Sequence, residues 1–149
     1  MKALSLWQPW ASLVAIGEKE WETRSWEMKY RGLLAIHAAK KVGDPEQGYA
    51  LDSDEIKEAL WNAGFKVFGD LPRGSVLCIV RVVDCLPTVK AISQGLIDRN
   101  EKRFGDYSPG RFCTRLEMVE VFKSPIPARG AQGLWDWAGM PARQEVAAS

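Results

Sequence analysis

Short apolar runs separated by turn residues predict a chain built mainly of strands. The predicted strands cover residues 3–7, 20–26, 33–39, 75–86 and 112–122. The run over 33–39 is apolar on both sides, which is typical of a central strand. The run over 75–86 gives the strongest strand signal, because it is rich in β-branched residues.

Helical periodicity is confined to short segments, and the clearest lies near the amino end. Trp10, Leu13 and Val14 follow one another at the i, i+3, i+4 spacing of a helix face. Pro9 stands at a first helical position, and Gly17 stands where a C-terminal cap is expected. The pattern therefore predicts a helix of about two turns at 3.6 residues each.

Later helical signals are weaker. A second helix is predicted over residues 56–63, after a capping box in which Asp52 takes the first position and Glu55 the last. Residues 87–104 are polar with a weak helical pattern, and a turn is predicted at 125–127 between two prolines. Strands outnumber helices, so a small barrel with a few helices against it fits best.

Length and composition narrow the classes of protein. A chain of 149 residues favours one domain. No window approaches the roughly 20 apolar residues of a membrane span, and the apolar run at the amino end is too short for a signal peptide. We therefore expect a cytoplasmic protein without membrane contact. The net charge is +1, so overall charge does not indicate a nucleic-acid binder, although residues 1–41 carry seven Lys or Arg against four Asp or Glu.

Cysteine and histidine usage argues against a metal site. The three cysteines have apolar surroundings and include no CxxC pair, so neither a disulfide framework nor a zinc site is predicted. We expect no metal and no cofactor. His37 is the single histidine, and its apolar strand favours a hydrogen-bonded core residue over a catalyst. A Ser-His-Asp mechanism lacks the Gly-x-Ser-x-Gly elbow that often supports it.

The segment from Gly17 to Arg24 carries the strongest candidate chemistry. Lys19, Glu22 and Arg24 follow at a Gly-x-Lys-x-x-Glu-x-Arg spacing, and several tryptophans flank them. Charges of both signs among large rings suit a cleft that holds a polar, flat ligand such as a nucleotide. The alternative is a trio of ion pairs that only orients a turn, although an exposed ion pair contributes about 0–1 kcal/mol.

Two opposing effects act on Lys19 in this motif. Desolvation makes its ammonium easier to deprotonate, so that the side chain could act as a base or nucleophile. The neighbouring carboxylate of Glu22 keeps it charged, and Lys19 and Arg24 would then form a cradle for phosphate or a base edge. The spacing leaves both possibilities open.

Four further segments, taken with this motif, resemble a known family. They are residues 4–11 (LSLWQPWA), 36–40 (IHAAK), 104–111 (FGDYSPGR) and 129–135 (RGAQGLW). In this order they resemble the ASCH family, in a branch found in bacteria and phages, over nearly the whole chain. The resemblance implies an α+β fold, a PUA-like β-pseudo-barrel of about five or six strands with a few peripheral helices. It also implies a cleft beside the barrel that holds the Lys, Glu and Arg.

The family resemblance implies binding of RNA or another single-stranded nucleic acid or nucleotide. Some members are amidohydrolases of acetylated cytidine, and ribonuclease activity is attributed to others. The amidohydrolase branch has a Thr where this chain has Glu22, and Thr23 is out of register, so its nucleophile is missing here. Hydrolysis of RNA or of a modified nucleoside is the alternative function, and a protein-interaction module of a transcription regulator is a second alternative.

The sequence therefore predicts one site and one domain. Residues 1–140 form the predicted domain, and residues 141–149 form a flexible tail. If the protein is an enzyme, Lys19 and Glu22 are its candidate catalytic residues. The predicted nucleic-acid-binding residues are Lys19, Arg24, Trp7, Gln8, Trp26, Tyr107, Ser108 and Arg111. In this interpretation Lys19→Ala weakens RNA binding and leaves the melting temperature nearly unchanged.

Overall fold

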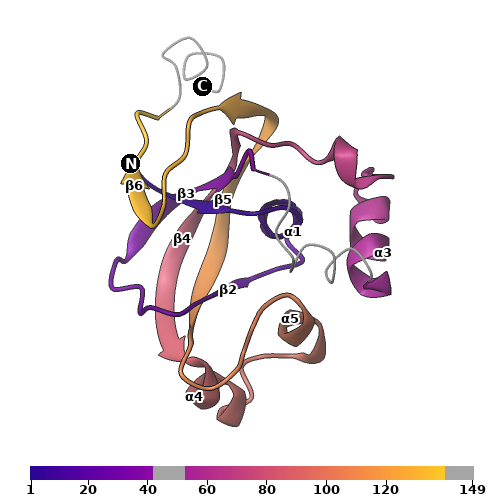
Figure 1. The fold of residues 1–149 in the computed structure, drawn as a ribbon. Coiled ribbons are helices and arrows are strands. Elements are labelled where there is room, and N and C mark those ends of the chain that lie inside the picture. Colours follow the sequence, from indigo (N-terminus) through magenta and orange to yellow (C-terminus); the bar gives the residue numbers. More distant parts are fainter. Residues whose placement is uncertain (42–52, 140–149) are drawn as a thin grey trace.

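The computed structural model describes residues 1–41 and 53–139, and a curled sheet is its main element (Figure 1). The elements, in chain order, are β1 (Lys2–Leu6), α1 (Trp10–Ala15), β2 (Trp21–Arg24), β3 (Gly32–Ala38), α3 (Asp54–Asn62), the 3₁₀ helix η1 (Phe68–Asp70), β4 (Ser75–Pro87), α4 (Thr88–Ser93), α5 (Arg99–Arg103), β5 (Phe112–Pro127) and β6 (Leu134–Asp136). In the described part of the chain the sheet has six strands, in the order β2-β5-β4-β3-β1-β6. The predicted α+β class and the sheet of five or six strands are confirmed.

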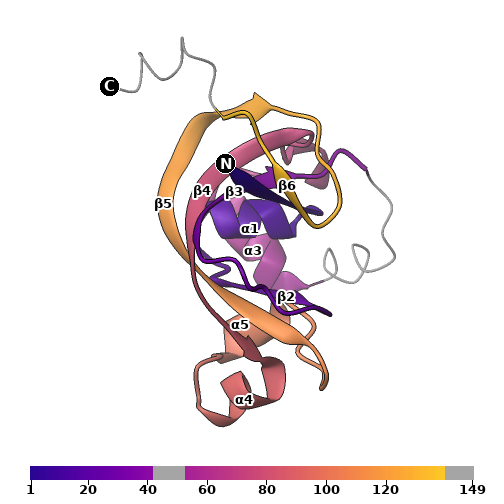
Figure 2. The same ribbon diagram turned by 90° about the vertical axis from the view of Figure 1, so that its left-hand side faces the viewer.

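The sheet curls into a half-barrel because its two longest strands are bent. β4 and β5 pair antiparallel, and their register shifts at three places, for example between Val76 and Cys78. Such bulges bend a strand and increase its twist. Figure 2 shows β4 and β5 sweeping around α1. β1 pairs parallel with β3 and antiparallel with β6, and this arrangement places the start of the chain inside the sheet.

The core lies on both faces of β3, as its two-sided apolar pattern predicts. One cluster joins Leu34 and Ile36 to Ala11 and Val14 of α1, on the concave face. A second cluster joins Ala35 to Trp137, which follows β6, on the other face. α3 then packs outside α1 through Ile56 and Leu60, which contact Leu13, while α4 and α5 lie at one end of the half-barrel (Figure 1).

The helices are short, and the start of α3 differs from the prediction. α3 begins at Asp54 and its N-cap is Ser53, whose hydroxyl accepts a hydrogen bond from the backbone N–H of Ile56 at 3.5 Å. Asp52, the expected cap, lies outside the described residues. The weak pattern over 87–104 corresponds to α4 and α5. Within residues 1–41 and 53–139, no helix has the length and apolar character that crossing a membrane requires.

The turn predicted at 125–127 is wrong, because β5 continues to Pro127. Ile126 and Pro127 still pair with Val76 and Ser75 of β4. Proline lacks a backbone N–H, so it is tolerated in a strand that has a neighbour on one side only. β2, the other neighbour of β5, pairs with it only at residues 112–115, which leaves the far end of β5 at an edge. That open edge accommodates the two prolines.

Candidate functional site

The link between α1 and β2 fixes the first residue of the charged motif. Gly17 adopts a φ of 84°, a left-handed conformation that glycine reaches without strain. The carbonyl of Leu13 then accepts from the backbone N–H of both Glu18 and Lys19. The turn directs the Lys19 side chain inward, where only 1% of it is exposed. Its Nζ donates to the carbonyls of Trp21 and Phe104, each at 2.5 Å.

The three ionic side chains form a row that leads from the interior to a cleft. Nζ of Lys19 lies 3.6 Å from Oε1 of Glu22, and Oε2 of Glu22 lies 3.2 Å from Nε of Arg24. Arg24 also donates from Nη2 to the carbonyl of Ser5 at 2.9 Å. Exposure of the side chains rises along the row, from 1% for Lys19 and 10% for Glu22 to 28% for Arg24. Lys19 is therefore the buried end and Arg24 the accessible end.

Both of the opposing effects expected at Lys19 act in the structure, and desolvation is the larger of the two. Desolvation lowers the pKa of Lys19 below its ordinary value, and the carboxylates of Glu22 and Glu101 oppose that shift. The ammonium nonetheless has a structural task, because two buried carbonyls accept hydrogen bonds from it. Lys19 lines neither of the two cavities described below.

Glu101 on α5 is a buried carboxyl group beside this row that the sequence pattern did not reveal. It accepts a hydrogen bond from the backbone N–H of Glu20, and burial raises its pKa. Its Oε2 and the hydroxyl of Tyr107 are buried without a hydrogen-bond partner in the described structure. Glu101 lies in a short polar segment whose helical pattern is weak, so only the fold shows that its side chain is buried.

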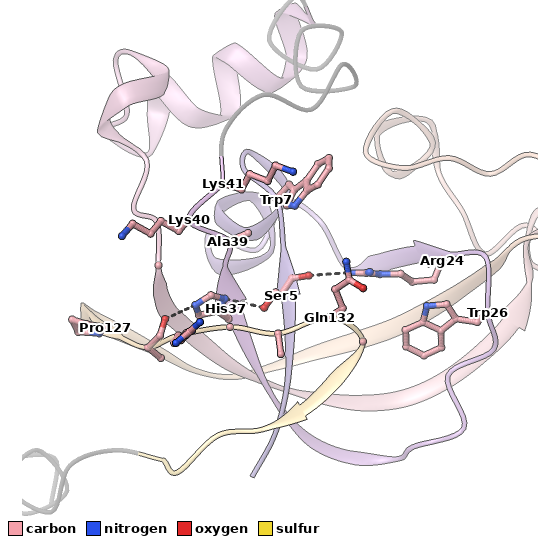
Figure 3. A pocket seen from close by; sticks show the side chains of 16 residues that line it. Ser5, Trp7, Arg24, Trp26, His37, Ala39, Lys40, Lys41, Pro127 and Gln132 are labelled. Atoms are coloured by element: carbon pink, nitrogen blue, oxygen red, sulfur yellow. Dashed lines mark hydrogen bonds between the residues drawn. The ribbon is translucent and has the colours of Figure 1, made fainter.

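Two adjoining cavities lie at the accessible end of the row. The larger has a volume of about 1050 Å³ and the smaller about 500 Å³. Ser5, Trp7 and Arg24 line both cavities, so the two share part of their walls. Figure 3 shows the larger cavity, with Arg24 and Trp26 on one side and Lys40 and Lys41 toward the other.

The two cavities differ in charge. The larger one is lined by four cationic side chains, Arg24, Lys40, Lys41 and Arg129, and among residues 1–41 and 53–139 no carboxylate lines it. The smaller one is lined by both cations and carboxylates. Arg24 pairs with Glu22, and Nε of Arg111 lies 3.5 Å from Oδ2 of Asp106. An anionic ligand is therefore attracted more strongly to the larger cavity.

A hydrogen-bonded chain forms the floor of the larger cavity. Nε2 of His37 lies 2.8 Å from the carbonyl of Ala128, which only accepts, so Nε2 carries the proton. Nδ1 then accepts from the hydroxyl of Ser5 at 2.9 Å, and Ser5 accepts from the indole N–H of Trp135 at 3.1 Å. His37 is 2% exposed, and burial lowers its pKa. It is the hydrogen-bonded, buried residue that its strand predicted.

Gly130 closes over this floor. A Cβ atom at this position would lie 2.6 Å from both Cε1 of His37 and Oγ of Ser5, closer than real side chains approach. The absence of a side chain lets the loop that carries Arg129 and Gln132 pack against β1 and β3. One wall of the larger cavity thus depends on this glycine.

Four of the predicted binding residues line the cavities. Trp7 is 38% exposed and lines both. Arg24 also lines both, Trp26 lines the larger cavity, and Arg111 lines the smaller. These residues lie at or just after the ends of β1 and β2 and in the loop before β5, so the fold brings three segments together.

The remaining predicted binding residues lie elsewhere. Gln8 is 1% exposed, and its side-chain amide donates to Ser12 and to the carbonyl of Pro72, each at 2.7 Å. Tyr107 is buried in a cluster with Trp21. Ser108 is exposed, donates to Asp106, and lines neither cavity. Gln8 and Tyr107, like Lys19, are part of the framework that shapes the cleft.

Sequence reasoning did not assign Lys40, Lys41, Arg129 and Gln132 to the site, although two of the family-like segments contain three of them. The parallel pairing of β1 with β3 sets Ser5 beside His37 and carries the chain on to Lys40. The hydrogen bond from His37 to Ala128 brings Arg129 to the same place. A signal was present in the basic pair that directly follows a predicted central strand.

Comparison with known proteins gives consistent results. Residues 4–123 match the ASCH domain. Human activating signal cointegrator 1 is 32% identical over 132 residues, and the mouse protein of the same name is 37% identical over 132 residues. Each alignment covers 89% of this chain but 21% of the relative, so the chain spans about a fifth of the length of the curated relatives it matches.

Solved structures show the same fold. The crystal structure of ASCH from Zymomonas mobilis aligns with a TM-score of 0.53 and 13% identity, covering 99% of this chain and 93% of that one. A point mutant of the same protein aligns with a TM-score of 0.52. At this identity the likeness concerns the fold alone. From the domain match and the sequence relatives together, the chain belongs to the ASCH domain family.

Proposed function

We propose that this protein is a nucleic-acid-binding module that holds RNA, or another single-stranded nucleic acid or nucleotide, in the joined cavities. The observation that carries the proposal is an open cleft in which an exposed indole ring and a half-buried one lie beside cations. Trp7 and Trp26 line the larger cavity together with Arg24 and three further basic residues. Single-stranded nucleic acids are bound by this combination of stacking platforms and positive charge. The family is associated with RNA binding in general, which agrees with this chemistry.

Arg24 is the contact residue of the charged motif in this proposal. Its guanidinium is held by Glu22 and by the carbonyl of Ser5, so its orientation is fixed before a ligand arrives. A preorganised fork of donors suits phosphate oxygens or a base edge. Glu22 is the positioning residue for Arg24. Lys19, from inside, neutralises Glu22 and holds the segment in place.

The test compares two exposed tryptophans by fluorescence anisotropy with labelled single-stranded RNA at about 50 mM salt, where phosphate contacts are strong. Trp7→Ala removes a ring that lines both cavities. Trp61→Ala removes a ring that is 55% exposed on α3 and lines neither, so it is the matched control. Loss of one stacked base, about 1–3 kcal/mol, corresponds to about 5- to 150-fold weaker binding for Trp7→Ala alone. Equal affinity of wild type and Trp7→Ala would overturn the proposal.

Hydrolysis is the competing function, and the placement of Glu22 is the observation that favours it. Its carboxylate lines the smaller cavity, which Asp106 also lines, and a carboxyl group that faces a cavity can serve acid–base chemistry. Lys19 lies behind Glu22 and does not line that cavity. Turnover of acetylcytidine or of labelled RNA by the wild type, lost in Glu22→Gln, would establish a hydrolase. Capture of protein partners without any nucleic-acid binding would instead indicate an interaction module.

A further inference from the structure

The larger cavity has basic residues on one side and an aromatic ring with an amide on the other, so its two sides suit different parts of a nucleic acid. We infer, on the basis of the proposed function, that single-stranded nucleic acid places its phosphates along Lys40, Lys41 and Arg129 and an unpaired base against Trp26 and Gln132. The nucleic-acid chain then continues past Trp7 into the smaller cavity. The inference assigns the phosphate subsite to three basic residues outside the Gly-x-Lys-x-x-Glu-x-Arg motif.

The basic side of the cavity is built from two chain segments that the fold ties together. A Cβ at Gly74 would lie 3.7 Å from the Cβ of Lys40, so the two residues are neighbours. The carbonyl of Gly74 accepts from the backbone N–H of Ala128 at 3.0 Å, and Arg129 follows directly. Lys40 and Arg129 therefore both lie close to Gly74, Lys40 through side-chain contact and Arg129 through its neighbour Ala128. Cations gathered from separate segments make a subsite for a charged backbone, because their mutual repulsion is relieved when phosphate binds.

The opposite side of the cavity suits a base. Figure 3 shows Trp26 and Arg24 across the cavity from Lys40, with Gln132 between the two sides. Trp26 is half-buried and packs against the core, so its ring is held in place where it lines the cavity. Gln132 is exposed and offers both a donor and an acceptor to a base edge. Stacking and hydrogen bonding of this kind require a base that is unpaired.

The size of the larger cavity, and the walls that it shares with the smaller one, fit a ligand longer than one nucleotide. A volume of about 1050 Å³ is at the upper end of the roughly 300–1,000 Å³ typical of pockets for single small molecules. Trp7 and Arg24 line both cavities, so a chain that leaves the larger one meets the smaller one directly. There the arginines already have carboxylate partners, so this second cavity contributes less phosphate attraction.

The experiment measures the salt dependence of RNA binding for single charge variants. Each phosphate contact on a single strand contributes about 0.7 to the slope of log K against log salt. Lys40→Ala and Arg129→Ala are each expected to lower the slope by about this amount. Lys90→Ala on α4 removes an exposed charge that lines neither cavity, and it should leave the slope unchanged. Melting temperatures of all variants check that the fold is intact.

Ligand series complete the test. Affinity should rise from a mononucleotide to an oligonucleotide of a few residues and then level off, and a blunt duplex should bind much more weakly. Inorganic polyphosphate should bind more weakly than RNA of equal length, and Trp26→Ala should abolish the difference.

The outcomes separate the two proposals. Unchanged slopes in both Lys40→Ala and Arg129→Ala, with RNA still bound and sensitive to Arg111→Ala, would overturn the inference and leave the proposed function standing. Duplex binding as tight as single-strand binding would also overturn the inference. Absence of any nucleic-acid binding by the wild type would overturn both.

Discussion

Replacing Lys19 by methionine tests the interpretation of the charged motif most directly. The methionine stem fills nearly the same space as the lysine stem, so the change removes the ammonium and little else. The wild-type ammonium is buried, donates to the carbonyls of Trp21 and Phe104, and faces Glu22 at 3.6 Å. All three partners lose a contact at once.

The expected loss of stability is large for a single substitution. Breaking a buried ion pair by removing one partner costs about 3–5 kcal/mol, and a buried carbonyl left without a donor costs about 1–3 kcal/mol. These terms overlap, and Glu22 keeps Arg24 as a partner, so the lower end, about 3 kcal/mol, is expected. For a chain of this size, each kcal/mol shifts the melting temperature by about 2–4 °C, which gives a decrease of about 6–12 °C.

The assay is urea unfolding, with the free energy of unfolding extrapolated to water. Lys29→Met is the matched control, because Lys29 is exposed and surface substitutions usually change stability by less than about 0.5 kcal/mol. A double-mutant cycle with Glu22→Gln then isolates the pair, and neighbours in one network show a coupling energy of about 0.5–3 kcal/mol. A Lys19→Met variant that unfolds with the same free energy as Lys29→Met would refute the reasoning. Because Lys19 is buried, we no longer expect its removal to leave the melting temperature nearly unchanged, as the sequence-based hypothesis of a binding residue predicts.

Two further predictions concern the floor of the larger cavity. Gly130→Ala should destabilise the protein by about 1–3 kcal/mol and weaken RNA binding, because its Cβ would overlap Ser5 and His37. Gly69→Ala is the control, because none of the described atoms would lie within 4 Å of a Cβ at that position. Thermal unfolding compares the two variants, and similar stability of both would contradict the prediction. For His37, burial lowers the pKa of the folded imidazole, so the unfolded chain takes up a proton at a higher pH. Stability from this group should be full above the ordinary histidine pKa of about 6.5 and decrease as the pH falls toward the lower folded value. The difference in free energy of unfolding between wild type and His37→Gln, measured at several pH values, should shrink on acidification, and a constant difference would contradict the assignment.

Much of the local structure could be predicted from the pattern of residues. The alternation and apolar runs identified β1, β3, β4 and most of β5, because a strand buried on one or both faces must present apolar side chains at fixed intervals. The spacing of Trp10, Leu13 and Val14 identified α1 for the same reason. The turn predicted at 125–127 was wrong. Whether a proline ends a strand depends on which strands pair beside it, and that pairing is set by the whole sheet.

The candidate site was likewise predictable from the sequence only in part. The sequence by itself determined that Lys19, Glu22 and Arg24 belong to one short segment, because Arg24 follows Lys19 by five residues. Only the tertiary structure decided that Lys19 is buried and Arg24 accessible, since one of the two carbonyls that accept from Lys19 belongs to Phe104, 85 residues further along the chain. It likewise decided that Lys40 and Arg129 share one cavity, through the β-pairing of the first strands and the hydrogen bond from His37 to Ala128. Local pattern fixes which side chains a segment carries, whereas burial and charge environment depend on groups that only long-range packing brings near.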